Sequence, residues 1–179
     1  MNKIEKIAVL PNLTKKGAYA VTLDVIKRLH KLGIEIFMPD ANKKDFPHDD
    51  IVFMDDTDSL CEASDMVLTV GGDGTIIHAA FHASFFNKPL LGINTGRLGF
   101  AAELEPDELD MLCRLSSGDY TIEKRMMLKI RHSGEKGIVE FRAMNDAVIS
   151  RGSLSRLIDI ESLLPLTRAI FAAIVPTDL

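Results

Sequence analysis

The stretch VLTVGGDGTIIHAA, residues 67–80, decides the fold predicted for this chain. A run of apolar residues leads into a turn that contains three glycines and Asp73, and an apolar helical pattern follows. A strand, a turn and a helix in this order belong to a β-α-β unit, which builds parallel sheets. Glycine lets the backbone turn sharply and lets a ligand approach it closely. The stretch therefore predicts an anion site at the end of a buried strand.

Similar strand and helix patterns continue on both sides of this stretch. Apolar runs predict strands over 6–10, 34–38, 51–54, 65–70 and 90–95. Apolar spacings of three and four predict a helix within 15–33, and the apolar pattern after the glycine turn predicts another over 75–86. Pro and acidic residues at the start and Gly at the end predict a helix within 105–118. Residues 120–150 alternate apolar and polar on either side of SGEKG, which predicts a β-hairpin. The predicted fold class is α/β, with an N-terminal Rossmann-like parallel-sheet domain followed by the start of an antiparallel β domain.

The composition argues against several classes of function. The net charge of −5 and the pI of about 5.5 disfavour a nucleic-acid-binding protein, which needs a basic surface. No apolar run reaches the roughly 18 residues of a membrane helix, and the N-terminal residues lack a signal-peptide pattern. Cys61 and Cys113 have no metal-type spacing, so the sequence favours a reducing, cytoplasmic compartment.

Asp73 is the unusual residue of the glycine turn. The first N–H groups of the helix that follows favour an anion, and phosphate is the natural ligand. The turn is neither a P-loop, because no Gly-Lys-Ser/Thr follows, nor a dinucleotide fingerprint, because residue 77 is Ile. Since a carboxylate repels phosphate, Asp73 either helps to hold Mg²⁺ or accepts a proton from an attacking hydroxyl. The alternative is an Asp-Gly turn that merely caps a helix.

Two other clusters give no metal prediction. His78 and His82 are four residues apart in HAAFH, but the segment lacks the Glu of H-E-x-x-H and a clear third ligand. Residues 39–58 are rich in Asp, but their spacing does not match an EF-hand loop. We therefore interpret 39–58 as a solvated connection that contains one short strand.

Three motifs together resemble those of bacterial NAD kinases. GGDGT (71–75) is similar to the nucleotide motif shared by NAD kinases, diacylglycerol-type lipid kinases and, more loosely, phosphofructokinases. GINTGRLGF (92–100) and MNDAVISRGSLSRLIDIE (144–161) resemble the second and third signatures of the bacterial-type NAD kinases, the ATP-NAD kinase family. The resemblance covers about residues 3–161, and the combination of motifs at these spacings is specific.

The resemblance implies a reaction and a set of residue roles. ATP would phosphorylate the 2′-hydroxyl of the adenosine ribose of NAD to give NADP, with Mg²⁺ or another divalent cation. Asp73 would be the catalytic base. The residues implied to bind phosphates, adenosine or the rest of the substrate are Gly71, Gly72, Gly74, Thr75, His78, Asn94, Leu98, Phe100, Asn145, Asp146 and Arg156.

Some of these roles have simpler alternatives. Phe100 could belong to the core rather than to the adenosine pocket. Asn145 and Asp146 could form a turn, although both are disfavoured within the strand-like run that contains them. Asn and Asp side chains could instead bond ribose hydroxyls or an exocyclic amine, since they offer the required donors and acceptors.

The chain departs from the family pattern after Glu161. The family continues for about a hundred residues with a second glycine-rich signature, but the only Gly-Gly pair here is 71–72. Pro165 and Pro176 interrupt an apolar segment without β alternation, so we expect a truncated or frame-shifted product. The expected domains are 1–118, α/β and nucleotide-binding; 119–161, a partial β-rich NAD-binding domain; and 162–179, an atypical tail.

Three functional hypotheses follow. The first is an NAD kinase, with NAD and ATP as its partners, no nucleic acid and no membrane, and a homo-oligomer in the full-length family. The second is a non-catalytic, nucleotide-binding remnant of that family. The third is a diacylglycerol-type lipid kinase, which would share GGDGT but should lack the other two motifs.

Overall fold

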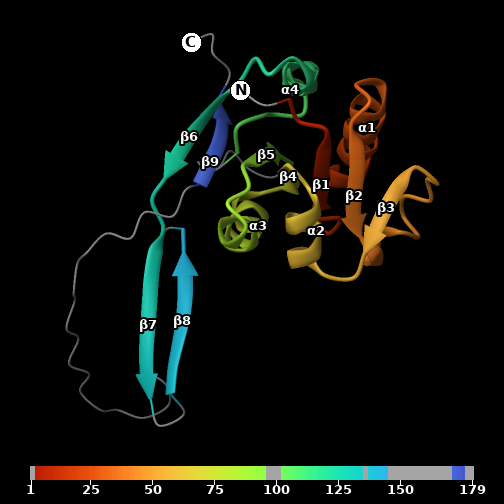
Figure 1. The fold of residues 1–179 in the computed structure, drawn as a ribbon. Coiled ribbons are helices and arrows are strands. Elements are labelled where there is room, and N and C mark those ends of the chain that lie inside the picture. Colours follow the sequence, from red (N-terminus) through yellow and green to blue (C-terminus); the bar gives the residue numbers. More distant parts are fainter. Residues whose placement is uncertain (1–2, 96–101, 135–136, 145–170, 176–179) are drawn as a thin grey trace.

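The computed structural model describes residues 3–95, 102–134, 137–144 and 171–175, and its centre is a parallel sheet (Figure 1). Five parallel strands have the spatial order β3-β2-β1-β4-β5. They are β1 (Lys6–Pro11), β2 (Glu35–Pro39), β3 (Ile51–Met54), β4 (Met66–Gly71) and β5 (Leu90–Asn94). All five predicted strands of the α/β part are therefore confirmed, and the fold class with them.

Helices cover both faces of the sheet. One face packs against α1 (Ala18–Lys31) and the segment formed by η2 (Leu109–Leu112) and α4 (Cys113–Ser117). The other face packs against α2 (Thr57–Ala63) and α3 (Asp73–Phe85) (Figure 1). A short 3₁₀ turn, η1 (Asp40–Asn42), follows β2. Two hydrophobic layers therefore hold the sheet, as in other doubly wound α/β folds.

The strand sequences explain the two layers. Ile7 and Val9 of β1 belong to the layer under α1, whereas Ala8 between them belongs to the layer under α2 and α3. All three side chains are fully buried. Because a central parallel strand is buried on both faces, it reads as a continuous apolar run instead of an alternating one.

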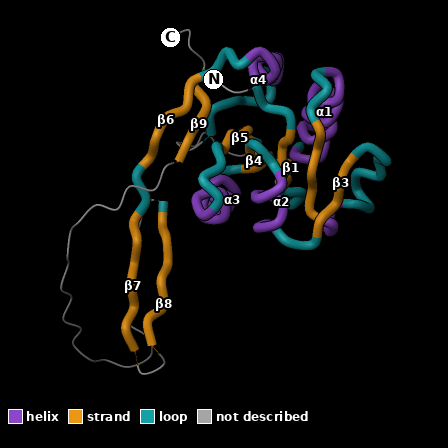
Figure 2. Tube along the Cα trace, in the orientation of Figure 1, coloured by secondary structure: helices purple, strands orange, loops and turns teal. Residues whose placement is uncertain are grey.

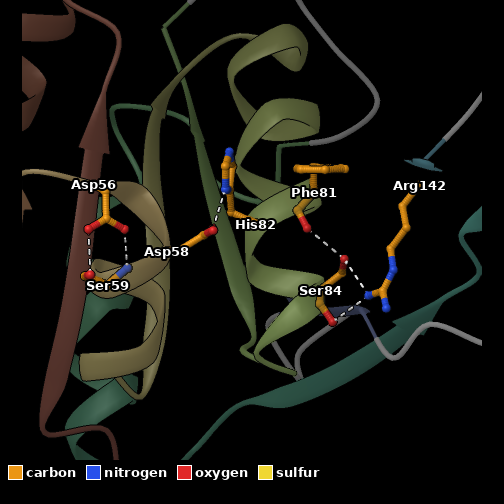
Figure 3. A network of polar contacts seen from close by, with 7 residues as sticks. All are labelled: Asp56, Asp58, Ser59, Phe81, His82, Ser84 and Arg142. Carbon is orange, nitrogen blue, oxygen red and sulfur yellow. Dashed lines mark hydrogen bonds and ion pairs between the residues drawn. The ribbon is translucent and has the colours of Figure 1, made fainter. Parts of the chain in front are cut away.

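Two helices differ from the sequence prediction. The pattern predicts a loop over 39–58, but α2 begins at Thr57. The Asp56 carboxylate caps α2, accepting hydrogen bonds from Ser59 N at 2.7 Å and Ser59 Oγ at 2.6 Å (Figure 3). These bonds from Ser59 hold the pKa of Asp56 below its ordinary value. The helix predicted within 105–118 is shorter, and begins as η2 at Leu109.

The remaining strands extend the fold beyond the parallel sheet. β6 (Thr121–Arg125) pairs antiparallel with β9 (Phe171–Val175), and β9 pairs parallel with β5. β7 (Leu128–Gly134) and β8 (Gly137–Ala143) form a separate antiparallel hairpin. The predicted hairpin is confirmed, and Figure 2 shows it extending away from the helices and the main sheet. The sequence pattern does not predict β9, because its run of apolar residues lacks alternation.

None of the helices in the described parts of the chain has the length and apolar character needed to cross a bilayer.

Candidate active site

A cleft of about 630 Å³ lies where the order of the parallel strands reverses. The chain leaves β1 toward β2 on one side and leaves β4 toward β5 on the other, so the loops after β1 and β4 separate. Ligands of open α/β sheets bind at this switch point, beyond the carboxyl ends of the strands. The cleft is lined by residues of the β1 loop, the end of β2, η1, α2 and α3: Leu10, Pro11, Asn12, Leu13, Thr14, Pro39, Ala41, Asn42, Thr57, Thr75, His78 and Ala79.

The glycine turn joins β4 directly to α3. Gly71 ends β4, Gly72 is the N-cap in an extended conformation, and Asp73 is the first residue of α3. A Cβ atom on Gly71 would lie 2.7 Å from the Cβ of Thr75, so Thr75 packs against the bare backbone of Gly71. Gly72 and Gly74 have open space where a Cβ would be. Asp73 therefore lies in the first helical turn, and the positive end of the α3 dipole is beside the cleft.

Asn12, in the loop after β1, also lines the cleft, although the sequence pattern does not identify it as a site residue. Its backbone N donates to Val70 O at 2.8 Å, and its Nδ2 donates to Thr75 Oγ1 at 3.0 Å. Its Oδ1 accepts from Thr14 N at 3.2 Å and Thr14 Oγ1 at 2.6 Å. Asn12 thus fixes the loop after β1 to the start of α3. The available signal is its place two residues after the predicted buried strand 6–10.

The end of β5 is held against the same turn. Asn94 is the register partner of Gly71, and Thr95 N donates to Gly71 O at 2.8 Å. The Asn94 side chain is buried, and its Nδ2 donates to Glu105 Oε1 at 3.0 Å. Thr95 Oγ1 is buried without a hydrogen-bond partner among the described residues. A buried hydroxyl of this kind is a candidate ligand contact, and the sequence pattern does not identify it.

Glu103 is a buried carboxylic acid next to β5. Its side chain is 6% exposed, its Oε2 accepts from Gly92 N at 2.7 Å, and its Oε1 lies 3.7 Å from Arg125 Nη2. Burial raises the pKa of Glu103 to about 7, although the Gly92 N–H and the Arg125 charge partly oppose the shift. The 102–105 segment is held to β5 by further backbone bonds, including Asn94 N to Leu104 O at 2.9 Å.

The two histidines of α3 have different surroundings. His78 is exposed and lines the cleft. His82 Nδ1 lies 2.7 Å from Asp58 Oδ1, which connects α3 to α2 (Figure 3). Their ring centroids are 5.1 Å apart. Among the described residues, no three His, Cys, Asp or Glu side chains form a group that could hold a metal ion.

The structure brings together seven of the predicted site residues at the carboxyl edge of β4 and β5. They are Gly71, Gly72, Asp73, Gly74, Thr75, His78 and Asn94. Five others lie outside the described residues: Leu98, Phe100, Asn145, Asp146 and Arg156.

Comparison with known proteins identifies the family. The family model for the ATP-NAD kinase N-terminal domain matches residues 7–120. NAD kinases of Thermoanaerobacter sp. (strain X514) and Natranaerobius thermophilus are 33% identical over 161 and 165 residues, covering 89% of this chain and 56% of each relative. The NAD kinase of Wolinella succinogenes is 30% identical over 163 residues. The chain thus spans about half the length of the curated relatives it matches.

A solved structure supports the fold. The structure of yeast NADH kinase complexed with NADH superposes with a TM-score of 0.70 at 19% identity, over 81% of this chain and 45% of that one. At 19% identity, this match shows a shared fold only. The sequence matches, in contrast, favour an NAD kinase over the lipid kinase alternative. The domain match covers more than half of the chain, and the chain therefore belongs to the NAD kinase family.

Proposed function

We propose that this chain transfers the γ-phosphoryl group of ATP to the 2′-hydroxyl of the adenosine ribose of NAD, giving NADP. The observation that carries the proposal is the cleft at the switch point, into which the first turns of α3 contribute Thr75 and His78. Bare glycine backbone and a helix N-terminus together suit a phosphate chain. The named relatives support NAD as the acceptor.

The donor phosphates would lie along the glycine turn. Gly71, Gly72 and Gly74 would allow their close approach, and the Thr75 hydroxyl and His78 would contact them from the side of the cleft. Asp73, in the same helical turn, would accept the proton of the attacking hydroxyl. A carboxylate placed there without a role in proton transfer or in cation binding would only repel the phosphates.

A divalent cation fits the residues around the turn. Mg²⁺ is usually held in kinase sites by one or two carboxylates together with substrate phosphates, and not by an all-protein cage. Asp73 supplies one carboxylate in the first turn of α3. When bound there, Mg²⁺ or another divalent cation would neutralise the phosphate charge.

The acceptor would occupy the side of the site nearest β5. The resemblance assigns Asn94, Leu98 and Phe100 to the adenosine pocket, Asn145 and Asp146 to ribose and adenine, and Arg156 to a further substrate contact. We propose the same assignments here. We also propose that the nucleotide-binding domain ends at residue 118 and the partial NAD-binding domain at residue 161. A homo-oligomer and a cytoplasmic location belong to the same proposal, and the free thiols of Cys61 and Cys113 are consistent with the latter.

The test is formation of NADP by the purified chain with ATP, Mg²⁺ and NAD. Asp73→Asn should lower the rate by at least about a hundredfold, as loss of a general base does. It should leave ATP binding measured without a divalent cation near the wild-type value, because the glycine backbone and the helix dipole remain. Nucleotide binding without any NADP from the folded wild-type chain would contradict the proposal and favour a non-catalytic remnant. An unchanged rate in Asp73→Asn would contradict the role of the base.

A further inference from the structure

The side-chain amide of Asn12 joins the loop after β1 to the first turn of α3. Its Oδ1 accepts hydrogen bonds from Thr14 N at 3.2 Å and from Thr14 Oγ1 at 2.6 Å. Its Nδ2 donates to Thr75 Oγ1 at 3.0 Å. All three residues line the cleft of about 630 Å³. A chain of hydrogen bonds therefore runs along one wall of the cleft, from Thr14 through Asn12 to Thr75.

These contacts determine which end of the Asn12 amide faces Thr75. A backbone N–H can only donate, so the Asn12 atom that faces Thr14 N must be the carbonyl oxygen. The amide nitrogen of Asn12 then faces Thr75, and this nitrogen can only donate. Thr75 Oγ1 is thus the acceptor of this contact, and the proton of its own hydroxyl must point elsewhere.

The hydroxyl proton of Thr75 is left for a ligand in the cleft. No described residue accepts a hydrogen bond from Thr75 Oγ1. The carbonyl oxygen of Gly71, four residues earlier, accepts from Thr95 N at 2.8 Å. The side chain of Thr75 lines the cleft itself. An acceptor oxygen that enters the cleft at α3 would therefore meet a hydroxyl that is already oriented as a donor.

We propose that Asn12 is a positioning residue, which orients the Thr75 hydroxyl so that it donates to a phosphate oxygen in the cleft. The inference rests on the proposed function, because it takes a phosphate chain as the ligand. The described residues that line this cleft include neither lysine nor arginine. Neutral donors such as an oriented hydroxyl must therefore supply side-chain contacts to the anion there.

Asn12→Asp would reverse the polarity of the contact with Thr75. Aspartate has nearly the same shape as asparagine but only accepts hydrogen bonds, so it can keep both bonds from Thr14. Its second oxygen would accept the Thr75 proton, which would then be lost to the ligand. The substitution also adds a negative charge, so the experiment must separate the effect of the charge from the loss of the donor.

The experiment is a double-mutant cycle between residues 12 and 75. Asn12→Asp, Thr75→Val and their combination are compared with the wild-type chain. Asn42→Asp is the matched control for charge, because Asn42 also lines the cleft and its side chain makes no hydrogen bond to a described residue. Calorimetry gives the dissociation constants of ATP and of inorganic tripolyphosphate, both with Mg²⁺. Far-UV circular dichroism checks that each variant is folded.

Thr75→Val should weaken the binding of both ligands about tenfold, because a hydrogen bond to a charged oxygen is lost. Asn12→Asp should weaken it about thirtyfold, of which about threefold comes from the added charge, as in Asn42→Asp. In the Thr75→Val background, Asn12→Asp should weaken binding only about threefold, because no hydroxyl proton remains to be redirected. Thr75→Ser keeps the hydroxyl and should bind within about twofold of wild type.

Equal weakening by Asn12→Asp with and without the Thr75 hydroxyl would overturn the inference, as would unchanged binding in Asn12→Asp. If Asn12→Asp does not fold, Asn12→Ala takes its place in the cycle and adds no charge. Asn12→Ala should weaken binding about threefold where Thr75 is present and leave it unchanged in the Thr75→Val background. The same loss in both backgrounds would again overturn the inference.

The cycle also separates this inference from the proposed function. A wild-type chain that binds ATP and tripolyphosphate but forms no NADP would overturn the proposed reaction alone. In that case the dissociation constants of the variants still decide the role of Asn12. A folded wild-type chain that binds neither ligand would overturn both.

Discussion

At the scale of single residues, the three glycines of GGDGT have different structural surroundings. A Cβ on Gly71 would overlap Thr75, whereas a Cβ on Gly74 would enter open space. Gly71 is therefore required by packing within the protein. Gly74, which is exposed, has no such requirement, and its absence of a side chain matters only if a ligand approaches it.

Gly71→Ala should destabilise the fold. The added methyl group must displace Thr75, which is itself bonded to Asn12, and overpacking of this kind costs about 1–3 kcal/mol. The measurement is the free energy of unfolding in urea. A Gly71→Ala chain as stable as wild type would show that the turn can relax without loss.

Gly74→Ala should raise the stability of the fold and lower its affinity for ATP. Alanine is a better helix former than glycine, so the free energy of unfolding should rise by about 0.5–1 kcal/mol. ATP affinity should fall in the same variant, because the methyl group would occupy space proposed for a phosphate. Calorimetry with ATP and Mg²⁺ measures the second effect. Unchanged ATP affinity would contradict close approach of phosphate at Gly74.

At the scale of elements, the segment 102–105 includes Glu103, and the titration of this carboxyl group should change the free energy of unfolding. The pKa of Glu103 is raised to about 7 by burial, so the folded chain holds this proton more tightly than the unfolded chain does. The stabilisation is complete below the ordinary pKa of 4.5 and is lost as the pH rises through about 7. The charged form must then be accommodated beside Gly92 and Arg125.

Wild type should therefore lose stability relative to Glu103→Gln between about pH 4.5 and pH 8, by on the order of 3 kcal/mol. Glutamine keeps an oxygen that accepts from Gly92 N but carries no proton to lose. Urea unfolding at several pH values measures the difference between the two chains. Parallel pH profiles for the two would contradict a raised pKa at Glu103.

The elements also show what the sequence could and could not predict. β1, β4 and α3 were predictable because buried parallel strands read as apolar runs and because glycines mark the turn. Asn12 was not, because it reaches the site only through the pairing of β1 with β4, which are far apart in sequence. α2 was not predicted because its seven residues are too few to show a clear helical period. β9 was not predicted because it is defined by its pairing with β5 and β6 and not by a local pattern.

At the scale of the whole molecule, the hairpin exposes an apolar face. Ile130 pairs with Phe141, and Val139 is the next residue of β8 on that face. Phe141 and Val139 are 50% and 47% exposed. Apolar strands that project from a protein favour association with other surfaces.

The chain should therefore self-associate at high concentration, and Val139→Thr combined with Phe141→Ser should reduce the association. Light scattering after size-exclusion chromatography gives the mass of each species. Arg131→Ala, on the charged face of the hairpin, is the control and should not reduce it. Equal masses for the double variant and wild type would show that this face does not mediate association.

We expect the phosphates of ATP to bind in the cleft between the β1 loop and the start of α3. A second groove, of about 580 Å³, lies between α1 and η2, and its charged lining residues are Lys27, Arg28, Lys31, Asp24 and Asp110. Arg28 pairs with both aspartates, so Lys27 and Lys31 supply the excess positive charge. Charge alone would favour this second groove for an anion, whereas the helix N-terminus and the glycine turn favour the first.

The most direct measurement is the shift of backbone amide NMR signals in the isotope-labelled chain when ATP and Mg²⁺ are added. We predict the largest shifts at residues 12–14 and 72–76, with small shifts around Lys27 and Lys31. Shifts concentrated around Lys27, Arg28 and Lys31, with residues 72–76 unchanged, would contradict it.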